Sequence, residues 1–176
     1  MSLRIASGLR RASLGAMPDG VGGCAFRVWA PEHRSVHVHL ISPVERLVPL
    51  GREAGGYHSA RVENVPPGTD YFFRLGGRGD RPDPASRWQP DGVHGPSRVA
   101  DTRFAWDDAG WAGLPLRKYV LYELHVGAFT ATGTFEGVIA RLPQLRELGI
   151  TAIELMPVAQ FPGTRNWGYD GVYPFA

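Results

Sequence analysis

The sequence predicts two architectures in one chain, an all-β sandwich followed by the start of a parallel α/β domain. Short runs of alternating apolar and polar residues, separated by glycine and proline turns, occupy the first part of the chain. A strand, a helix and a second strand then follow between Val120 and Met156, in the order of a βαβ unit. Because such a unit needs further strands and helices to bury it, we expect the chain to be the front end of a larger α/β enzyme.

The sandwich prediction depends on five short strand signals. In Ala25–Ala30, Phe26 and Val28 share one face. The other four runs are Ser35–Leu40, Arg46–Leu50, Tyr57–Val62 and Asp70–Leu75. Strands at this spacing are typical of an immunoglobulin-like sandwich, which we predict over residues 15–77, after an N-terminal tail of residues 1–14.

The next segment, residues 78–116, has neither a helical nor a strand period. It is rich in Pro, Gly, Asp and Arg, most of all between Asp80 and Ser97. Because proline fixes the backbone, this segment is expected to be stiff. We interpret it as a structured connector between domains, with direct contact to a substrate as the alternative.

Residues 117–176 form the predicted α/β part. Its strands are Val120–His125 and Thr151–Met156. Between them, Thr134–Leu148 carries apolar residues at spacings of three and four, which predicts a helix with one face against a sheet. Pro143 should kink or split this helix, because proline removes a backbone hydrogen bond.

The candidate site lies where the two strands end, because ligands of parallel α/β folds meet the carboxyl ends of the strands. His125 ends the first strand, and the loop after the second carries Phe161, Trp167, Tyr169 and Tyr173. Flat aromatic rings with polar tips suit the apolar faces and hydroxyl rims of sugars. The alternative is that these rings only pack under the loop.

The composition argues against several other classes of protein. The net charge is +2 and the basic residues are scattered, so no nucleic-acid partner is expected. No apolar run is long enough for a membrane span, and no membrane partner is expected. One cysteine and the lack of a complete export signal predict a cytoplasmic location. His37 and His39 share one strand face, which we interpret as a solvent-facing surface. No third ligand is evident, so we expect no metal site, and no cofactor is expected.

Four segments resemble the α-amylase family of glycoside hydrolases. Gly149–Pro157 is similar to the second strand of that family's barrel, and Trp167–Asp170 to the Gly-Tyr element that follows it. Tyr122–Gly127 resembles the first barrel strand of branching enzymes and their relatives. Within this group, the segment from Pro82 to Gly95 most resembles malto-oligosyltrehalose trehalohydrolases.

The resemblance implies an immunoglobulin-like sandwich followed by the first βαβ part of a truncated (β/α)8 barrel, residues 117–176. It implies cleavage of the α-1,4 bond next to the terminal trehalose of maltooligosyl trehalose, which releases trehalose. The family's retaining mechanism uses an Asp nucleophile and a Glu acid/base. These residues come from later barrel strands, so no catalytic residue is expected in this chain.

The resemblance also suggests roles in substrate binding. Tyr169 would stack on the sugar at the cleavage subsite, and Trp167 and Asp170 would shape that pocket. By strand order alone, His125 and Phe129 would lie near its rim. Two alternatives stay open: a fragment of a glycogen branching or debranching enzyme, and a stand-alone carbohydrate-binding module.

Overall fold

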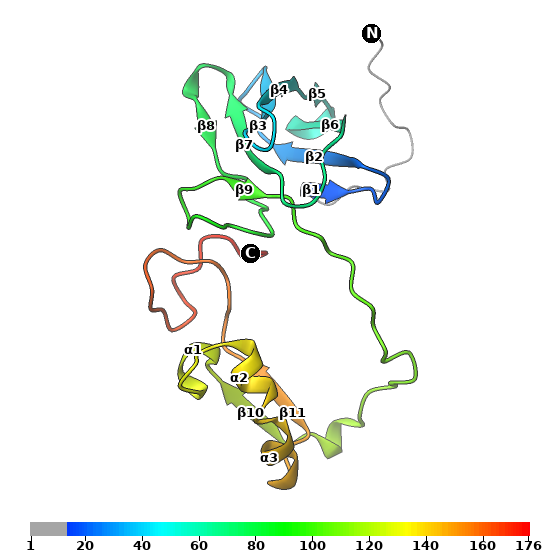
Figure 1. Ribbon diagram of the computed structural model, residues 1–176, viewed down its shortest axis with the longest axis vertical. Coiled ribbons are helices and arrows are strands. Elements are labelled where there is room, and N and C mark those ends of the chain that lie inside the picture. The colour runs from blue at the N-terminus through cyan, green and yellow to red at the C-terminus, as the bar shows by residue number, and fades with distance from the viewer. Residues whose placement is uncertain (1–13) are drawn as a thin grey trace. The chain divides into compact units, whose positions relative to one another are not determined.

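The computed structural model describes residues 14–176, which form two compact units (Figure 1). One unit runs to Thr102 and also includes Val172–Ala176, and the other is Arg103–Gly171. Residues 1–13, which make up most of the predicted N-terminal tail, lie outside the described residues. The boundary between the units falls inside the predicted connector, residues 78–116.

The first unit is a sandwich of two antiparallel sheets. One sheet has the strand order β1–β2–β6–β5, and the other has the order β4–β3–β7–β8, with β9 also paired to β7. The strands are β1 Gly15–Pro18, β2 Gly23–Trp29, β3 Val36–Leu40, β4 Arg46–Pro49, β5 Gly51–Arg52, β6 Tyr57–Glu63, β7 Asp70–Leu75, β8 Asp80–Arg81 and β9 Ser97–Arg98. Short 3-10 helices lie at Ala54–Gly56 and Gly76–Arg78, and a third, Leu116–Lys118, belongs to the second unit. The prediction of a sandwich is confirmed.

The core of the sandwich lies between the two sheets. Phe26 and Val28 of β2 are buried, as their alternation predicted, and Tyr71 and Phe73 of β7 are buried with them. The rings of Phe26 and Tyr71 meet edge to face, with centroids 5.0 Å apart. Each fully buried side chain of this size stabilises the fold by about 1.5–3 kcal/mol.

The sandwich extends past its predicted end at Gly77. β8 and β9 both pair with β7, and Val99 is fully buried in the core. Arg98 forms an ion pair with Asp70, Nε to Oδ1 2.5 Å, and its guanidinium lies 5.0 Å from the centre of the Trp88 ring. The first part of the predicted connector therefore belongs to the sandwich. Two-residue strands are too short to show an alternation.

A network of buried polar groups holds the Pro-rich segment in place. The Asp83 carboxylate is fully buried, and it accepts hydrogen bonds from the Tyr71 hydroxyl (2.6 Å) and the Ala85 N–H (2.8 Å). The Asp83 N–H donates to Ser97 Oγ (3.0 Å), which in turn donates to Gln89 Oε1 (2.7 Å). These bonds replace the solvation that the polar groups lose on burial.

The burial of Asp83 predicts a pH-dependent stability of the sandwich. Burial raises the pKa of Asp83 to about 6. The hydrogen bonds from Tyr71 and Ala85 lower the pKa, but their effect is smaller than that of burial. A carboxyl with a raised pKa in the folded state takes up a proton on folding, so its stabilising effect is complete below about pH 4 and is lost as the pH rises through about 6. The loss is on the order of 3 kcal/mol. Urea unfolding between pH 4 and 7 measures it.

Asp83→Asn is the control for this prediction, because an amide does not titrate. The variant should remove most of the change in unfolding free energy between pH 4 and 6. Hydrogen bonds lower the pKa values of Asp19, Glu53 and Asp80, so these groups act mainly below that window. An unchanged pH slope in Asp83→Asn would assign the effect to other groups.

The two histidines of β3 differ in their surroundings. His37 is half-buried, but His39 is buried, which contradicts the prediction that both face solvent. Asp80 Oδ2 lies 2.8 Å from His39 Nδ1, and Glu45 Oε1 lies 3.0 Å from Nε2. The prediction failed because β8 and the turn before β4 cover this face. Within residues 14–176, no cluster of His, Cys, Asp or Glu could hold a metal ion.

The second unit is a βαβ unit, as predicted. β10 (Leu121–Leu124) and β11 (Ala152–Leu155) pair in parallel, with Leu121 opposite Ala152. The helices between them are α1 (Val126–Phe129), α2 (Phe135–Ile139) and α3 (Leu142–Glu147). The sequence did not predict α1.

The predicted helix Thr134–Leu148 is split in two. Thr134 caps α2, and its Oγ1 accepts a hydrogen bond from the Gly137 N–H at 3.3 Å. Pro143 lies in the first turn of α3, where a missing N–H costs nothing. The proline therefore separates α2 from α3, which was one of the two expected outcomes.

The βαβ unit leaves much apolar surface uncovered. Val138 and Leu145 are buried, but Leu121 is 62% exposed and Leu148 is 73% exposed. A two-stranded sheet with helices on it has too few neighbours to bury such side chains. No helix formed by residues 14–176 has the length and apolar character needed to cross a membrane.

Candidate functional site

A cleft lies at the carboxyl ends of β10 and β11. Its volume is about 860 Å³, and both strand ends contribute to it, His125 after β10 and Met156–Pro157 after β11. Residues 164–168 of the following loop and Asp170 also line it, together with residues 126–128, Gly133, Phe135, Val158 and Phe161. This is the end of the sheet where ligands of parallel α/β folds bind. The structure therefore places a concave site where the sequence predicted one.

Asn166 organises the loop that borders the cleft. Its Oδ1 accepts hydrogen bonds from the N–H groups of Gly168 (2.7 Å), Tyr169 (3.2 Å) and Asp170 (3.4 Å). Its backbone carbonyl lies 2.6 Å from His125 Nε2, which must be the donor because a carbonyl oxygen only accepts. Asn166 is not among the residues predicted from the sequence. The tendency of Asn side chains to hydrogen-bond the backbone two residues further on is the signal that could have found it.

Two glycines bring the loop against the segment that follows β11. Gly168 has φ +97°, and a Cβ there would lie 2.7 Å from Pro157 Cδ and 2.9 Å from its carbonyl oxygen. A Cβ on Gly171 would lie 2.7 Å from Ala159 Cβ. The glycines on either side of Tyr169–Asp170 therefore permit close approach of the backbone.

Three of the predicted site residues come together at the cleft. His125, Trp167 and Asp170 all line it. The rings of His125 and Trp167 meet edge to face, with centroids 5.7 Å apart. Trp167 is 71% exposed. An exposed aromatic face beside a carboxylate and an imidazole can bind a ligand that has apolar faces and hydroxyl groups.

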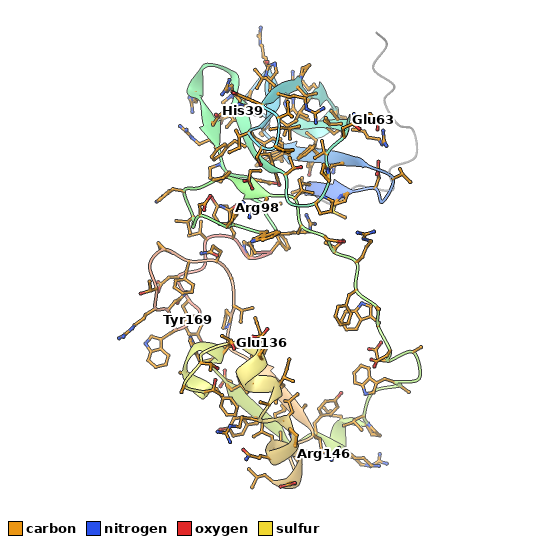
Figure 2. The ribbon with its side chains drawn as sticks, in the orientation of Figure 1. His39, Glu63, Arg98, Glu136, Arg146 and Tyr169 are labelled. Carbon is orange, nitrogen blue, oxygen red and sulfur yellow. The ribbon has the colours of Figure 1, made fainter. Side chains whose placement is uncertain are left out.

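The other two predicted residues lie outside the lining of the cleft. Tyr169 lies on the same loop (Figure 2). It is 76% exposed. Phe129 packs instead against Tyr122, with ring centroids 6.0 Å apart. Trp167 and Tyr169 are exposed, whereas Tyr173 of the same aromatic loop is buried and its hydroxyl donates to the Val93 carbonyl at 2.9 Å. The interpretation as packing therefore fits Tyr173 better than the two exposed rings.

Among the residues that line the cleft, Asp170 is the one carboxylate. Glu123 and Glu154 are opposite each other in the register of β10 and β11, and neither lines the cleft. A retaining glycosidase needs two carboxyl groups at roughly 5–5.5 Å. The described residues offer no such pair in this cleft.

Known proteins resemble this chain over both of its units. The profile of carbohydrate-binding module 48, the isoamylase N-terminal domain, matches residues 13–91. A malto-oligosyltrehalose trehalohydrolase from Saccharolobus solfataricus is 46% identical over 154 residues, which are 88% of this chain and 27% of the relative. One from Deinococcus radiodurans is 44% identical over 94% of the chain and 27% of its own length.

The predicted resemblance to the malto-oligosyltrehalose trehalohydrolases is confirmed. The chain spans about a quarter of the length of these trehalohydrolases. A 1,4-α-glucan branching enzyme from Streptomyces coelicolor is less similar, at 32% identity over 90% of the chain. The chain is thus more similar to these trehalohydrolases than to this branching enzyme.

Solved structures agree with this relationship. A candidate α-amylase from Salmonella typhimurium has a TM-score of 0.82 and 43% identity, and the match covers 91% of this chain and 27% of that one. A pullulanase from Anoxybacillus, solved with maltotetraose, has a TM-score of 0.72 and 25% identity, and the match covers 91% of this chain and 28% of that one. The sandwich thus resembles the N-terminal domains of α-amylase family enzymes.

Proposed function

We propose that this chain forms the sandwich and the first part of the (β/α)8 barrel of a glycosidase that acts on maltooligosyl trehalose. The enzyme would hydrolyse the α-1,4 bond next to the terminal trehalose, and it would work in the cytoplasm. The observation that carries the proposal is the 46% identity to a trehalohydrolase over 88% of the chain, which includes both units. The parallel pairing of β10 with β11 and the cleft at their carboxyl ends support it.

Within this enzyme the chain would supply one wall of the substrate site. Tyr169 would stack on the sugar at the cleavage subsite, and Trp167 and Asp170 would shape its surroundings. The exposure of both rings supports this role, because a ring that is not needed for packing is free to contact a ligand. His125 would hold the loop through its bond to Asn166. Phe129 stays a candidate for the rim.

The chain by itself should hydrolyse no α-glucan. Two carboxyl groups must flank the bond that breaks, and the cleft holds one. We expect no trehalose from maltooligosyl trehalose when the purified 176-residue protein is assayed at high concentration. Release of trehalose by this protein would mean that the catalytic pair lies within it.

The positive test uses a longer protein, in which this chain is followed by the remaining barrel strands. These strands are taken from a downstream reading frame or from the Saccharolobus solfataricus relative, and we call this protein the complete enzyme. Trehalose release would support the proposal. Transfer of a glucan branch, or cleavage of branch points, would support the branching or debranching alternative. Glucan binding by the sandwich with no activity in any complete enzyme would support a stand-alone binding module.

A further inference from the structure

We propose that Asn166 is a positioning residue, which fixes the ring of Tyr169 at the substrate site through the backbone of the loop. The inference deepens the proposed function, on which it rests. It assigns the placement of the sugar-binding ring to the side-chain oxygen of Asn166, which backbone N–H groups of the loop already engage.

The first observation is that the Tyr169 side chain cannot fix its own position. It is 76% exposed, so the described residues do not pack around the ring. Its place must then be set by the backbone that carries it. Asn166 Oδ1 accepts the Tyr169 N–H at 3.2 Å, and the N–H groups of the residues before and after it converge on the same oxygen.

The second observation is that the same residue ties the loop to β10. The carbonyl of Asn166 accepts the hydrogen bond of His125 Nε2 at 2.6 Å, and His125 directly follows that strand. Trp167 packs edge to face on the His125 ring. These contacts hold the loop at the end of β10, and a strand end is a rigid element on which to build a binding site.

The third observation is that the hydrogen bonds of Asn166 are hard to replace. Gly168 is buried, so its N–H cannot form a hydrogen bond with water when the acceptor is lost. Gly168 also lies against Pro157, where a Cβ would clash at 2.7 Å, so the loop has little room for another path. Loss of Oδ1 should release the turn and let Tyr169 move.

The test compares two substitutions of Asn166 in the complete enzyme. Asn166→Ala removes the acceptor, and we expect kcat/KM for maltooligosyl trehalose to fall by about tenfold or more. Asn166→Asp keeps an oxygen that accepts the same N–H groups, and it should retain activity within about threefold. Gln160→Ala is the matched control, because the Gln160 amide donates to the carbonyl of the adjacent Phe161 and does not line the cleft, and it should change little.

A double-mutant cycle separates positioning from general damage. If Asn166 acts through Tyr169, Asn166→Ala should lower kcat/KM by less than about threefold when Tyr169 is already alanine. If the double variant instead loses the product of the two single losses, the proposal is overturned. An Asn166→Ala enzyme as active as Gln160→Ala, or an Asn166→Asp enzyme as weak as Asn166→Ala, would also overturn it.

Hydrogen exchange gives a readout that does not need the proposed reaction. In the complete enzyme, the amides of Gly168, Tyr169 and Asp170 should exchange about tenfold or more faster in Asn166→Ala, and at the original rate in Asn166→Asp. Equal exchange in all three proteins would overturn the positioning role. If the complete enzyme releases no trehalose but shows this pattern, the proposed function fails and the role of Asn166 stands.

Discussion

Replacing Tyr169 with alanine in the complete enzyme should lower kcat/KM for maltooligosyl trehalose by about tenfold or more, which is about 1.4 kcal/mol of transition-state stabilisation. The ring would stack on the sugar where the sugar distorts towards its transition state. Because the side chain is 76% exposed, its removal should hardly change thermal unfolding. Steady-state kinetics and a melting curve on the same samples measure both effects.

Tyr169→Phe is the control for this substitution, since it keeps the ring and loses only the hydroxyl. It should stay within about threefold of the original enzyme if stacking is what matters. Activity of Tyr169→Ala within about twofold of the original would reduce Tyr169 to a surface residue. A large loss in Tyr169→Phe as well would assign the effect to the hydroxyl.

Amide exchange in the 176-residue chain should differ strongly between its two units. The sandwich closes its core between two sheets, whereas the strands β10 and β11 have no further strands to pair with among the described residues. A domain with about 5 kcal/mol of stability slows the exchange of its core amides by at least roughly a thousandfold. We therefore expect slow exchange in β2, β3, β6 and β7, and fast exchange in β10 and β11.

Association of the chain is the related expectation, because exposed strand edges and apolar side chains promote it. In the complete enzyme, the added strands should slow exchange in β10 and β11 to the level of the sandwich. Strong and equal protection of both units in a monomeric sample of the chain alone would contradict the truncated-barrel account. It would show that residues 103–171 form a stable fold of their own.

Strong periodic patterns made the main elements predictable. The alternation around Phe26 and Val28 predicted a strand with one buried face, and both side chains are buried. The apolar runs on either side of the helix predicted β10 and β11, which pair in parallel. Pro143 predicted the break between α2 and α3, because the chemistry of proline is local.

Features that depend on contacts between distant residues were not predictable in the same way. β8 and β9 are two residues long, and only their pairing with β7 identifies them. The burial of Asp83 depends on Tyr71 and Ser97, which a periodicity analysis does not connect to it. His39 was expected at the surface because its cover comes from Asp80, a residue far along the chain.

The sequence predicted where the candidate site lies better than it predicted which contacts build the site. The rule that ligands bind at the carboxyl ends of parallel strands located the cleft, and His125 and Trp167 line it as expected. The role of Asn166 was missed because its hydrogen bonds go to backbone groups, which carry no signal in the sequence apart from the tendency of Asn side chains to hydrogen-bond the backbone two residues further on. Phe129 was selected by strand order alone, and it packs on Tyr122.

Product analysis of the complete enzyme on maltooligosyl trehalose tests the central claim most directly. The account predicts free trehalose and a shortened maltooligosaccharide in equal amounts, with none from the 176-residue chain assayed beside it. The same enzyme should release no trehalose once its added carboxylates are replaced by amides. A complete enzyme that folds, binds the substrate and yields products without trehalose would contradict the account.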